Sequence, residues 1–143
     1  MKRLAMVAVL VLAAGTTAAC GSNGGGKTSV GSTQSRTWNV SDADNGHTLA
    51  VHFGDTLIVT LHSTYWTIGP SDGLILDPQG EPQPSTAPSC AHSVPGSGCG
   101  TVTATYDIGH VGTSTLKAHR TSCGEALRCI GTAGEWSLTV VAT

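Results

Sequence analysis

The stretch that decides the fold is TVTATYDI, Thr101–Ile108. Its apolar side chains, Val102, Ala104, Tyr106 and Ile108, alternate with threonines and one aspartate. Neighbouring side chains on an extended chain point to opposite faces, so the apolar residues share one face and the threonines share the other. A strand with one buried face and one wet face is typical of an antiparallel sheet.

The same alternation recurs along the chain. It is present in HTLAVHF (47–53), TLIVTLH (56–62), GTSTLKAHR (112–120) and EWSLTVVA (135–142), with weaker strands expected near Thr37–Val40 and Gly73–Leu76. In the first stretch, Leu49, Val51 and Phe53 are expected to face inward. The mature domain lacks helical periodicity, apart from a single turn that GEALR (124–128) could form. About seven short antiparallel strands joined by Gly- and Pro-rich turns predict an all-β, immunoglobulin-like β-sandwich.

The N-terminus has the parts of an export signal. Lys2 and Arg3 precede the apolar run LAMVAVLVLAA, and small residues then lead to Cys20. This order predicts a signal peptide over residues 1–19, with an apolar run too short for a permanent membrane span. Ala-Ala-Cys-Gly resembles the lipobox of bacterial lipoproteins, of the actinobacterial type, which implies a lipid on Cys20. We therefore expect a lipid-anchored protein on the extracytoplasmic face of the cell membrane; the alternative is an ordinary secretory signal.

Composition separates a tether from a folded domain. Residues 20–35, CGSNGGGKTSVGSTQS, are rich in Gly and Ser and predict a flexible tether, and residues 36–143 fit one domain. Without residues 1–19 the chain has five Lys and Arg against nine Asp and Glu, a formal net charge of −4. Since no basic cluster is present, we expect no nucleic-acid partner. No nucleophile elbow, phosphate-binding loop or convergent carboxylate pair stands out, so we expect a protein without cofactor or enzymatic activity.

Four cysteines follow Cys20, namely Cys90, Cys99, Cys123 and Cys129. An even number in an exported protein predicts disulfides, and three pairings are open. We favour Cys90–Cys99 and Cys123–Cys129, because each closes a Gly-, Pro- and polar-rich segment that has little else to hold it. Zinc is the alternative, but the spacing is not that of structural zinc sites. The first pair would staple a long loop that we expect over residues 77–98, which hold five prolines.

Two histidines form the remaining candidate metal site. His52 and His62 fall on the outward faces of stretches expected to pair as a hairpin, so their rings could approach each other and bind copper or zinc. No third ligand stands at suitable spacing, and isolated surface histidines are common. We therefore expect no metal.

Recognition by a sandwich is expected from its loops. Three loops, over residues 62–69, 95–100 and 120–129, would emerge at one edge of the sandwich. The first contains Tyr65 beside Trp66, and only one of these rings can enter the core. Trp66 begins the next strand and is expected between the sheets. Tyr65 then points outward, where it would either bind a partner or cover the edge of the sandwich.

These stretches resemble the chagasin family of cysteine-protease inhibitors over about Thr48 to Ala142. GSGCGTVTATY, GTSTLKAHR and WSLTVV follow the family's order of Gly-rich loop, strand, G-T strand, basic loop and last strand. Gly96-Ser97-Gly98-Cys99, with Gly100 next, stands where the family has G-x-G-G. The stretch HSTYW (62–66) stands where it has N-P-T-T-G-aromatic, and Arg120 stands where R-P-W begins.

The resemblance implies a reversible inhibitor that blocks papain-like cysteine proteases with three adjacent loops. The residues that it implies as partner-binding are Ser63, Thr64, Tyr65, Gly96, Ser97, Gly98, Gly100 and Arg120. Tyr65 and its neighbours would enter the protease cleft, while the loop over residues 96–100 covers the catalytic cysteine and Arg120 rests on the rim. The alternative is a structural or adhesion domain of the cell envelope. The strand pattern also resembles that of bacterial immunoglobulin-like domains in cell-surface proteins.

Overall fold

The computed structural model describes residues 34–69, 71–124 and 127–143. The expected signal peptide (1–19), the lipidation site Cys20 and most of the expected tether lie outside the described residues. None of the helices in the described ranges is long and apolar enough to span a membrane.

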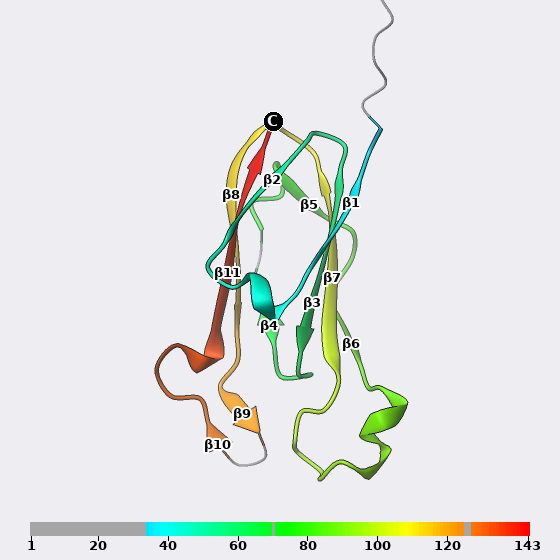
Figure 1. Ribbon diagram of the computed structural model, residues 1–143, viewed down its shortest axis with the longest axis vertical. Helices are drawn as coiled ribbons and strands as arrows, with labels where there is room; N and C mark the ends of the chain where they lie inside the picture. Colours follow the sequence, from blue (N-terminus) through cyan, green and yellow to red (C-terminus); the bar gives the residue numbers. More distant parts are fainter. Residues whose placement is uncertain (1–33, 70, 125–126) are drawn as a thin grey trace, which may run out of the picture. The chain divides into compact units, whose positions relative to one another are not determined.

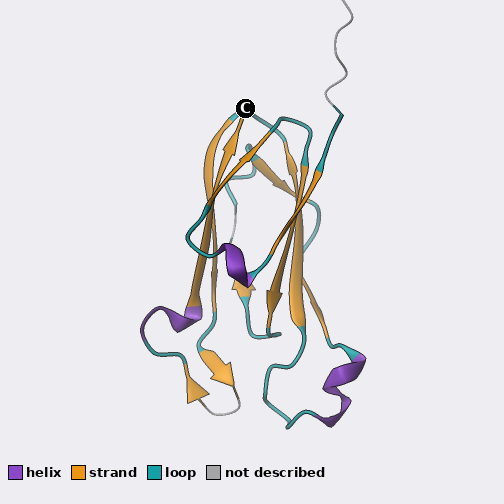
Figure 2. Ribbon diagram, viewed as in Figure 1, coloured by secondary structure: helices purple, strands orange, loops and turns teal. Residues whose placement is uncertain are grey.

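Two sheets face each other and form a β-sandwich (Figures 1 and 2). The first sheet has the order β1 (Thr37–Val40), β3 (Thr56–His62), β7 (Thr101–Ile108), β5 (Leu76–Pro78), and β6 (Gln83–Ser85) also pairs with β7. The second has the order β2 (Thr48–Val51), β11 (Glu135–Ala142), β8 (Gly112–His119), β4 (Thr67–Ile68). A small hairpin joins β9 (Ser122–Gly124) to β10 (Leu127–Arg128). Short 3-10 helices are η1 (Asp42–Asp44), η2 (Pro88–His92) and η3 (Gly131–Gly134). The immunoglobulin-like sandwich predicted from the sequence is confirmed.

The core lies between the two sheets and follows the alternation in the sequence. All four apolar residues of the stretch 101–108 are buried, from Val102 to Ile108. They meet a set from β3, β8 and β11 that includes Leu57, Val59, Leu61, Leu116, Leu138 and Val140, each at most 1% exposed. Trp66 and Trp136 complete the same cluster. Burial of these side chains from water is the main stabilising contribution to the domain.

Two strand pairs are parallel, which differs from the expectation of an antiparallel fold. β1 pairs with β3, and β2 pairs with β11, in parallel register. The reason is that the N-terminal segment supplies one strand to each sheet: β1 joins the first, the chain crosses over through η1, and β2 joins the second (Figure 1). Each strand buries its last residue, Val40 or Val51, in the core.

The turn after β2 explains two further corrections. Asp55 is 2% exposed, and its carboxylate accepts hydrogen bonds from the backbone N–H of His52 (2.9 Å) and Arg36 (2.8 Å) and from the Trp38 indole N–H (2.8 Å). These bonds end β2 at Val51 and lead the chain into the other sheet. Phe53, expected inside, is therefore 61% exposed.

The same crossing separates the two histidines. β2 and β3 belong to different sheets and do not form a hairpin, so the expected approach of His52 to His62 is wrong. Within the described ranges there is no group of three or more His, Cys, Asp or Glu residues that could hold a metal ion.

The segment over residues 77–98 has more structure than a loop. It contains β6 and η2, and Pro84 lies within β6 opposite Val102. Proline is accepted there because β6 is an edge strand. β9 and β10 pair antiparallel between Cys123 and Cys129. The single turn that GEALR (124–128) could form includes residues 125–126, which lie outside the described residues.

Candidate functional site

Three loops meet at one end of the sandwich, which we call the loop end (lower part of Figure 1). They are the β3–β4 turn (63–66), the β6–β7 segment (86–100) and the β8–β11 segment (120–134). The strand register places them together, because His62 pairs with Thr101 and Thr67 pairs with His119. The loops that the sequence predicted side by side thus adjoin one another.

The first two loops are joined by three hydrogen bonds. Ser63 N–H donates to Gly100 O (2.9 Å), and Thr64 N–H donates to Gly98 O (2.9 Å). The Tyr65 hydroxyl donates to Gly96 O. Six of the eight residues expected to bind a partner are therefore joined by these bonds.

Two glycines permit this close approach. At Gly98, φ is +68°, and an added Cβ would lie 2.5 Å from Cδ2 of Tyr65 and 2.8 Å from Oγ of Ser63. At Gly100, φ is +129°, and an added Cβ would lie 2.3 Å from the carbonyl oxygen of Ser85. Both positions need glycine for its backbone conformation and for its lack of a side chain.

Ser63 holds the turn in a conformation that is rare for a residue with a side chain. Its φ is 119°, in the region that favours glycine. The hydrogen bond to Gly100 O holds its backbone, and its own Oγ accepts from Tyr65 N–H (3.2 Å). Strained residues of this kind concentrate at binding and active sites, where the surrounding structure imposes them.

The neighbouring aromatic residues divide as the alternation predicted. Trp66 is 7% exposed and packs in the core, and its indole N–H donates to His62 O (3.0 Å). Tyr65 is half-buried and lies outside the core, with its ring against Gly98. Tyr65 thus covers the edge of the sandwich and at the same time fixes the second loop.

Arg120 joins the third loop to the first. Its guanidinium carbon lies 4.6 Å from the centre of the Trp66 ring, a cation–π contact. Its backbone N–H donates to Gly134 O (2.9 Å), which closes the base of the third loop. Arg120 therefore packs against Trp66 within the domain, and its expected contact with the rim of a protease cleft stays a prediction.

Both disulfides have the expected pairing. Cys90–Cys99, with a Cα–Cα distance of 5.7 Å, closes the segment that carries Gly96 and Gly98. Cys123–Cys129, with 4.9 Å, closes the β9–β10 hairpin. A covalent closure limits the conformations open to each loop.

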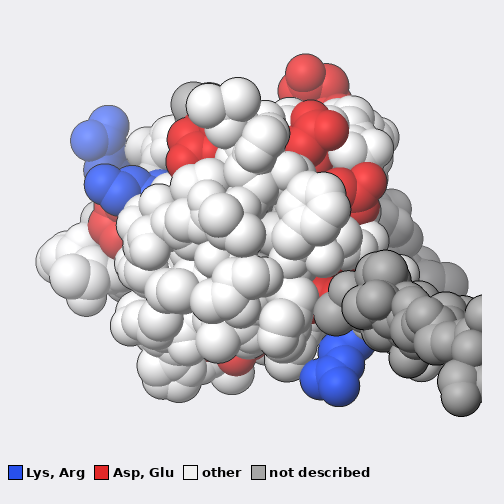
Figure 3. All heavy atoms as spheres, turned by 90° about the horizontal axis from the view of Figure 1, so that it is seen from above, with Lys and Arg blue, Asp and Glu red and all other residues white. Residues whose placement is uncertain are grey.

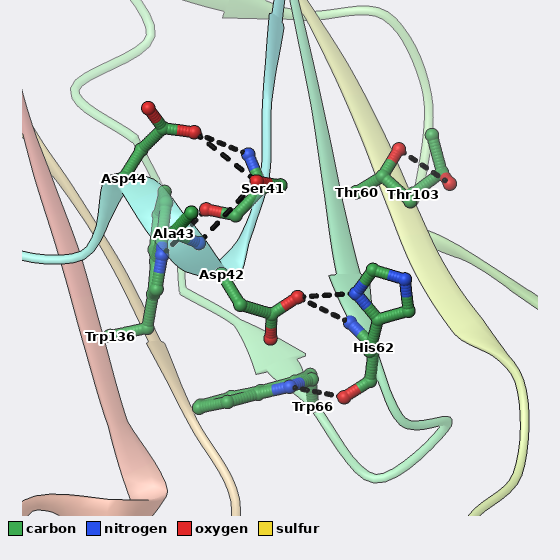
Figure 4. A network of polar contacts seen from close by, with 9 residues as sticks. All are labelled: Ser41, Asp42, Ala43, Asp44, Thr60, His62, Trp66, Thr103 and Trp136. Atoms are coloured by element: carbon green, nitrogen blue, oxygen red, sulfur yellow. Dashed lines mark hydrogen bonds and ion pairs between the residues drawn. The ribbon is translucent and has the colours of Figure 1, made fainter.

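A polar network supports the first loop from the side (Figure 4). The Asp42 carboxylate lies 2.6 Å from Nδ1 of His62 and accepts from His62 N–H (3.0 Å). Ser41 and Asp44 form a capping box that starts η1, and Ser41 O accepts from the Trp136 indole (3.2 Å). His62, which the sequence offered as a metal ligand, is thereby paired with a carboxylate of η1.

Apolar side chains at the loop end escaped the sequence reasoning. Val94 is 56% exposed, Leu127 71% and Ile130 86%. Leu127 and Ile130 lie close to Cys129, in a segment whose apolar residues do not alternate with polar ones. This lack of alternation was the only feature of the sequence that set them apart from core residues. A groove of about 590 Å³ lies between Tyr65 and the 86–99 segment that carries Val94. The loop end thus combines bare glycine backbone, a half-buried tyrosine and exposed apolar groups, which suits contact with a protein.

No protein-family model matches the chain, and no curated protein matches its sequence. Solved structures do match. The chain is similar in fold to a cysteine protease inhibitor. This inhibitor, EhICP2 from Entamoeba histolytica, has 12% sequence identity and a TM-score of 0.55, over 77% of this chain and 98% of that chain. Amebosin has 14% identity and a TM-score of 0.52, over 76% and 98%. At such identity these matches show a shared fold.

Proposed function

We propose that the protein is a lipid-anchored, extracytoplasmic, reversible inhibitor of papain-like cysteine proteases. The observation that carries the proposal is the joined loop end, in which Tyr65 and the backbone around Gly98 are bound to each other before any partner arrives. The fold that the chain shares with a cysteine protease inhibitor supports the same class of target. The anchor is proposed from the lipobox-like Cys20 and the Gly/Ser-rich segment that follows it.

The second loop is suited to cover a catalytic cysteine. Gly96 is exposed and has no side chain, and Gly98 is partly exposed beside it, so this part of the segment can come close to a nucleophile in a narrow cleft. Hydrogen bonds from Ser63, Thr64 and Tyr65, together with the Cys90–Cys99 disulfide, resist the movement that would present a peptide bond for cleavage. Such a loop would block the cleft without becoming a substrate.

The other two loops would supply affinity. A half-buried tyrosine with one exposed side and a fixed hydroxyl loses little conformational freedom on binding. Leu127 and Ile130 are presented on or beside a disulfide-closed hairpin and would bury apolar surface against the protease. Arg120 would act through Trp66, by fixing the third loop relative to the first.

A titration of papain tests the proposal. With residues 36–143 in increasing amount, peptide hydrolysis should fall to zero at a stoichiometric ratio and return on dilution, and the chain should remain uncleaved. The control variant is Val94→Ser/Leu127→Ser/Ile130→Ser, which should need a higher concentration for the same inhibition. Full protease activity at excess of the wild-type chain would favour a structural or adhesion domain.

A further inference from the structure

The end of the sandwich opposite the loops also exposes apolar side chains. Phe53 is 61% exposed, Leu74 71% and Val111 66%, and they lie on the β2–β3, β4–β5 and β7–β8 connections. These connections are bonded to one another, through Gly54 N–H to Ile108 O (2.9 Å) and Gly109 N–H to Ile75 O (3.1 Å). Among the described residues, all six exposed large apolar side chains therefore belong to the two ends, with three at each.

This end, which we call the entry end, is poor in charge at its centre. Seen from above, its lysines, arginines, aspartates and glutamates lie around the periphery (Figure 3). Two carboxylates close to it are engaged within the domain: Asp72 accepts from Ile75 N–H (2.9 Å), and Asp107 accepts from the Thr56 hydroxyl (2.9 Å). A surface with apolar side chains at its centre and charges around its periphery is suited to an apolar contact at the centre.

The chain enters the domain at this same end. β1 runs parallel to β3, with Thr37 opposite Thr56. Arg36 N–H is bound to the Asp55 carboxylate, and Thr56 N–H donates to Arg36 O (2.8 Å). Arg36 is thus fixed beside the turn that carries Phe53. A lipid on Cys20 would be attached to the domain through this point.

We propose that the entry end lies on the lipid surface, with Phe53, Leu74 and Val111 in the interfacial layer. The inference rests on the lipid anchor of the proposed function. An anchor at the entry end keeps the domain close to the membrane, so binding of its surface to lipid is effectively an intramolecular step. Weak insertion of three side chains is then enough to orient the domain. The loop end, on the far side of the sandwich, then faces away from the membrane toward an arriving protease.

Fluorescence quenching on vesicles tests this orientation. Residues 20–143 are coupled through the Cys20 thiol to a maleimide lipid in phosphatidylcholine vesicles, which supplies the anchor chemically. A tryptophan is placed at the entry end in Phe53→Trp or, as matched control, at the loop end in Ile130→Trp. Lipids brominated in their acyl chains should quench the added fluorescence of Phe53→Trp about threefold more than that of Ile130→Trp, since tryptophan enters the interfacial layer. Adding Leu74→Ser/Val111→Ser to Phe53→Trp should remove the difference.

Equal quenching at the two ends would overturn the proposal, because it means that the domain turns freely on its anchor. A second result would also overturn the proposal: the uncoupled chain forms a dimer, and Leu74→Ser/Val111→Ser abolishes that dimer. The entry end would then bind a second copy of the chain. Because the coupling replaces biological acylation, neither result depends on whether the cell attaches lipid to Cys20. Papain inhibition by the entry-end variant should equal that of the wild type, which separates this test from that of the loop end.

Discussion

Gly98→Ala should disrupt the contact between the first two loops of the loop end. The new Cβ would lie 2.5 Å from Cδ2 and 2.6 Å from Cε2 of Tyr65, so the ring must leave its place. The positive φ of +68° disfavours alanine by about 1–2 kcal/mol, and the overlap adds about 1–3 kcal/mol. We expect a loss of about 2–5 kcal/mol in the free energy of unfolding.

Two other glycines separate the backbone contribution from the overlap. Gly96 has φ +83°, with only the Tyr65 hydroxyl near an added Cβ, at 3.8 Å. Gly46 has φ +77° and open space around it. Gly96→Ala and Gly46→Ala should therefore cost only the backbone component, about 1–2 kcal/mol in urea-unfolding experiments.

A double-mutant cycle then identifies Tyr65 as the group displaced. Tyr65→Ala should partly rescue Gly98→Ala, with a coupling free energy of about 1–2 kcal/mol. The rescue is partial because Oγ of Ser63 lies 2.8 Å from the same added Cβ. Gly98→Ala should also weaken papain inhibition by about tenfold or more, since the first two loops lose their shared contact. A cost equal to that of Gly46→Ala, or strict additivity with Tyr65→Ala, would refute this reasoning.

Three more predictions concern the core, the buried carboxylate and the anchor. Trp66→Ala should lower the free energy of unfolding by about 3–5 kcal/mol, as measured by thermal melts. Tyr65→Ala should lower it by less than half of that, but should weaken protease binding by about 2 kcal/mol in inhibition titrations. Burial alone would raise the pKa of Asp55, but hydrogen bonds from the His52, Trp38 and Arg36 N–H groups, with the charge of His52, lower it below its ordinary value of 3.8. Its stabilisation is therefore present above that pH and lost as pH falls through the lower folded value, so Asp55→Asn should be about 2–4 kcal/mol less stable at pH 7 and lose this acid dependence in pH-dependent urea melts. Cys20→Ala should move the protein from the detergent phase to the aqueous phase, and unchanged membrane association would disprove the anchor.

Local pattern predicted the inward faces of the long strands and the assignment of Trp66. This was possible because the period-2 alternation of a strand is a property of neighbouring residues, as in Val102 to Ile108. The sheet to which each strand belongs is not a local property. β1 and β2 read as ordinary strands, yet each pairs in parallel with a strand that does not follow it directly, β3 and β11 respectively. The exposed position of Phe53 follows from Asp55, whose donors come from its own turn, at His52, and from β1 and the residue before it, at Trp38 and Arg36.

The candidate site was predictable as a set of loops and not as a set of contacts. Gly-rich and aromatic stretches indicated which segments to compare, but the bond from Tyr65 to Gly96 links residues 31 positions apart. The position of Arg120 on the rim of a protease cleft comes from the family resemblance alone. Its stacking on Trp66 depends on the register of β4 with β8, which no local pattern shows. Leu127 and Ile130 carried no periodic signal, so only the fold reveals that they are exposed.

The measurement that tests the central claim most directly is the rate at which a thiol-alkylating reagent modifies the catalytic cysteine of papain in the presence of the chain. If the loop over residues 96–100 covers that cysteine, the alkylation rate should fall in parallel with residual activity as the chain is added, and Gly98→Ala should restore much of it. Alkylation at the full rate with the wild-type chain in excess would contradict the account.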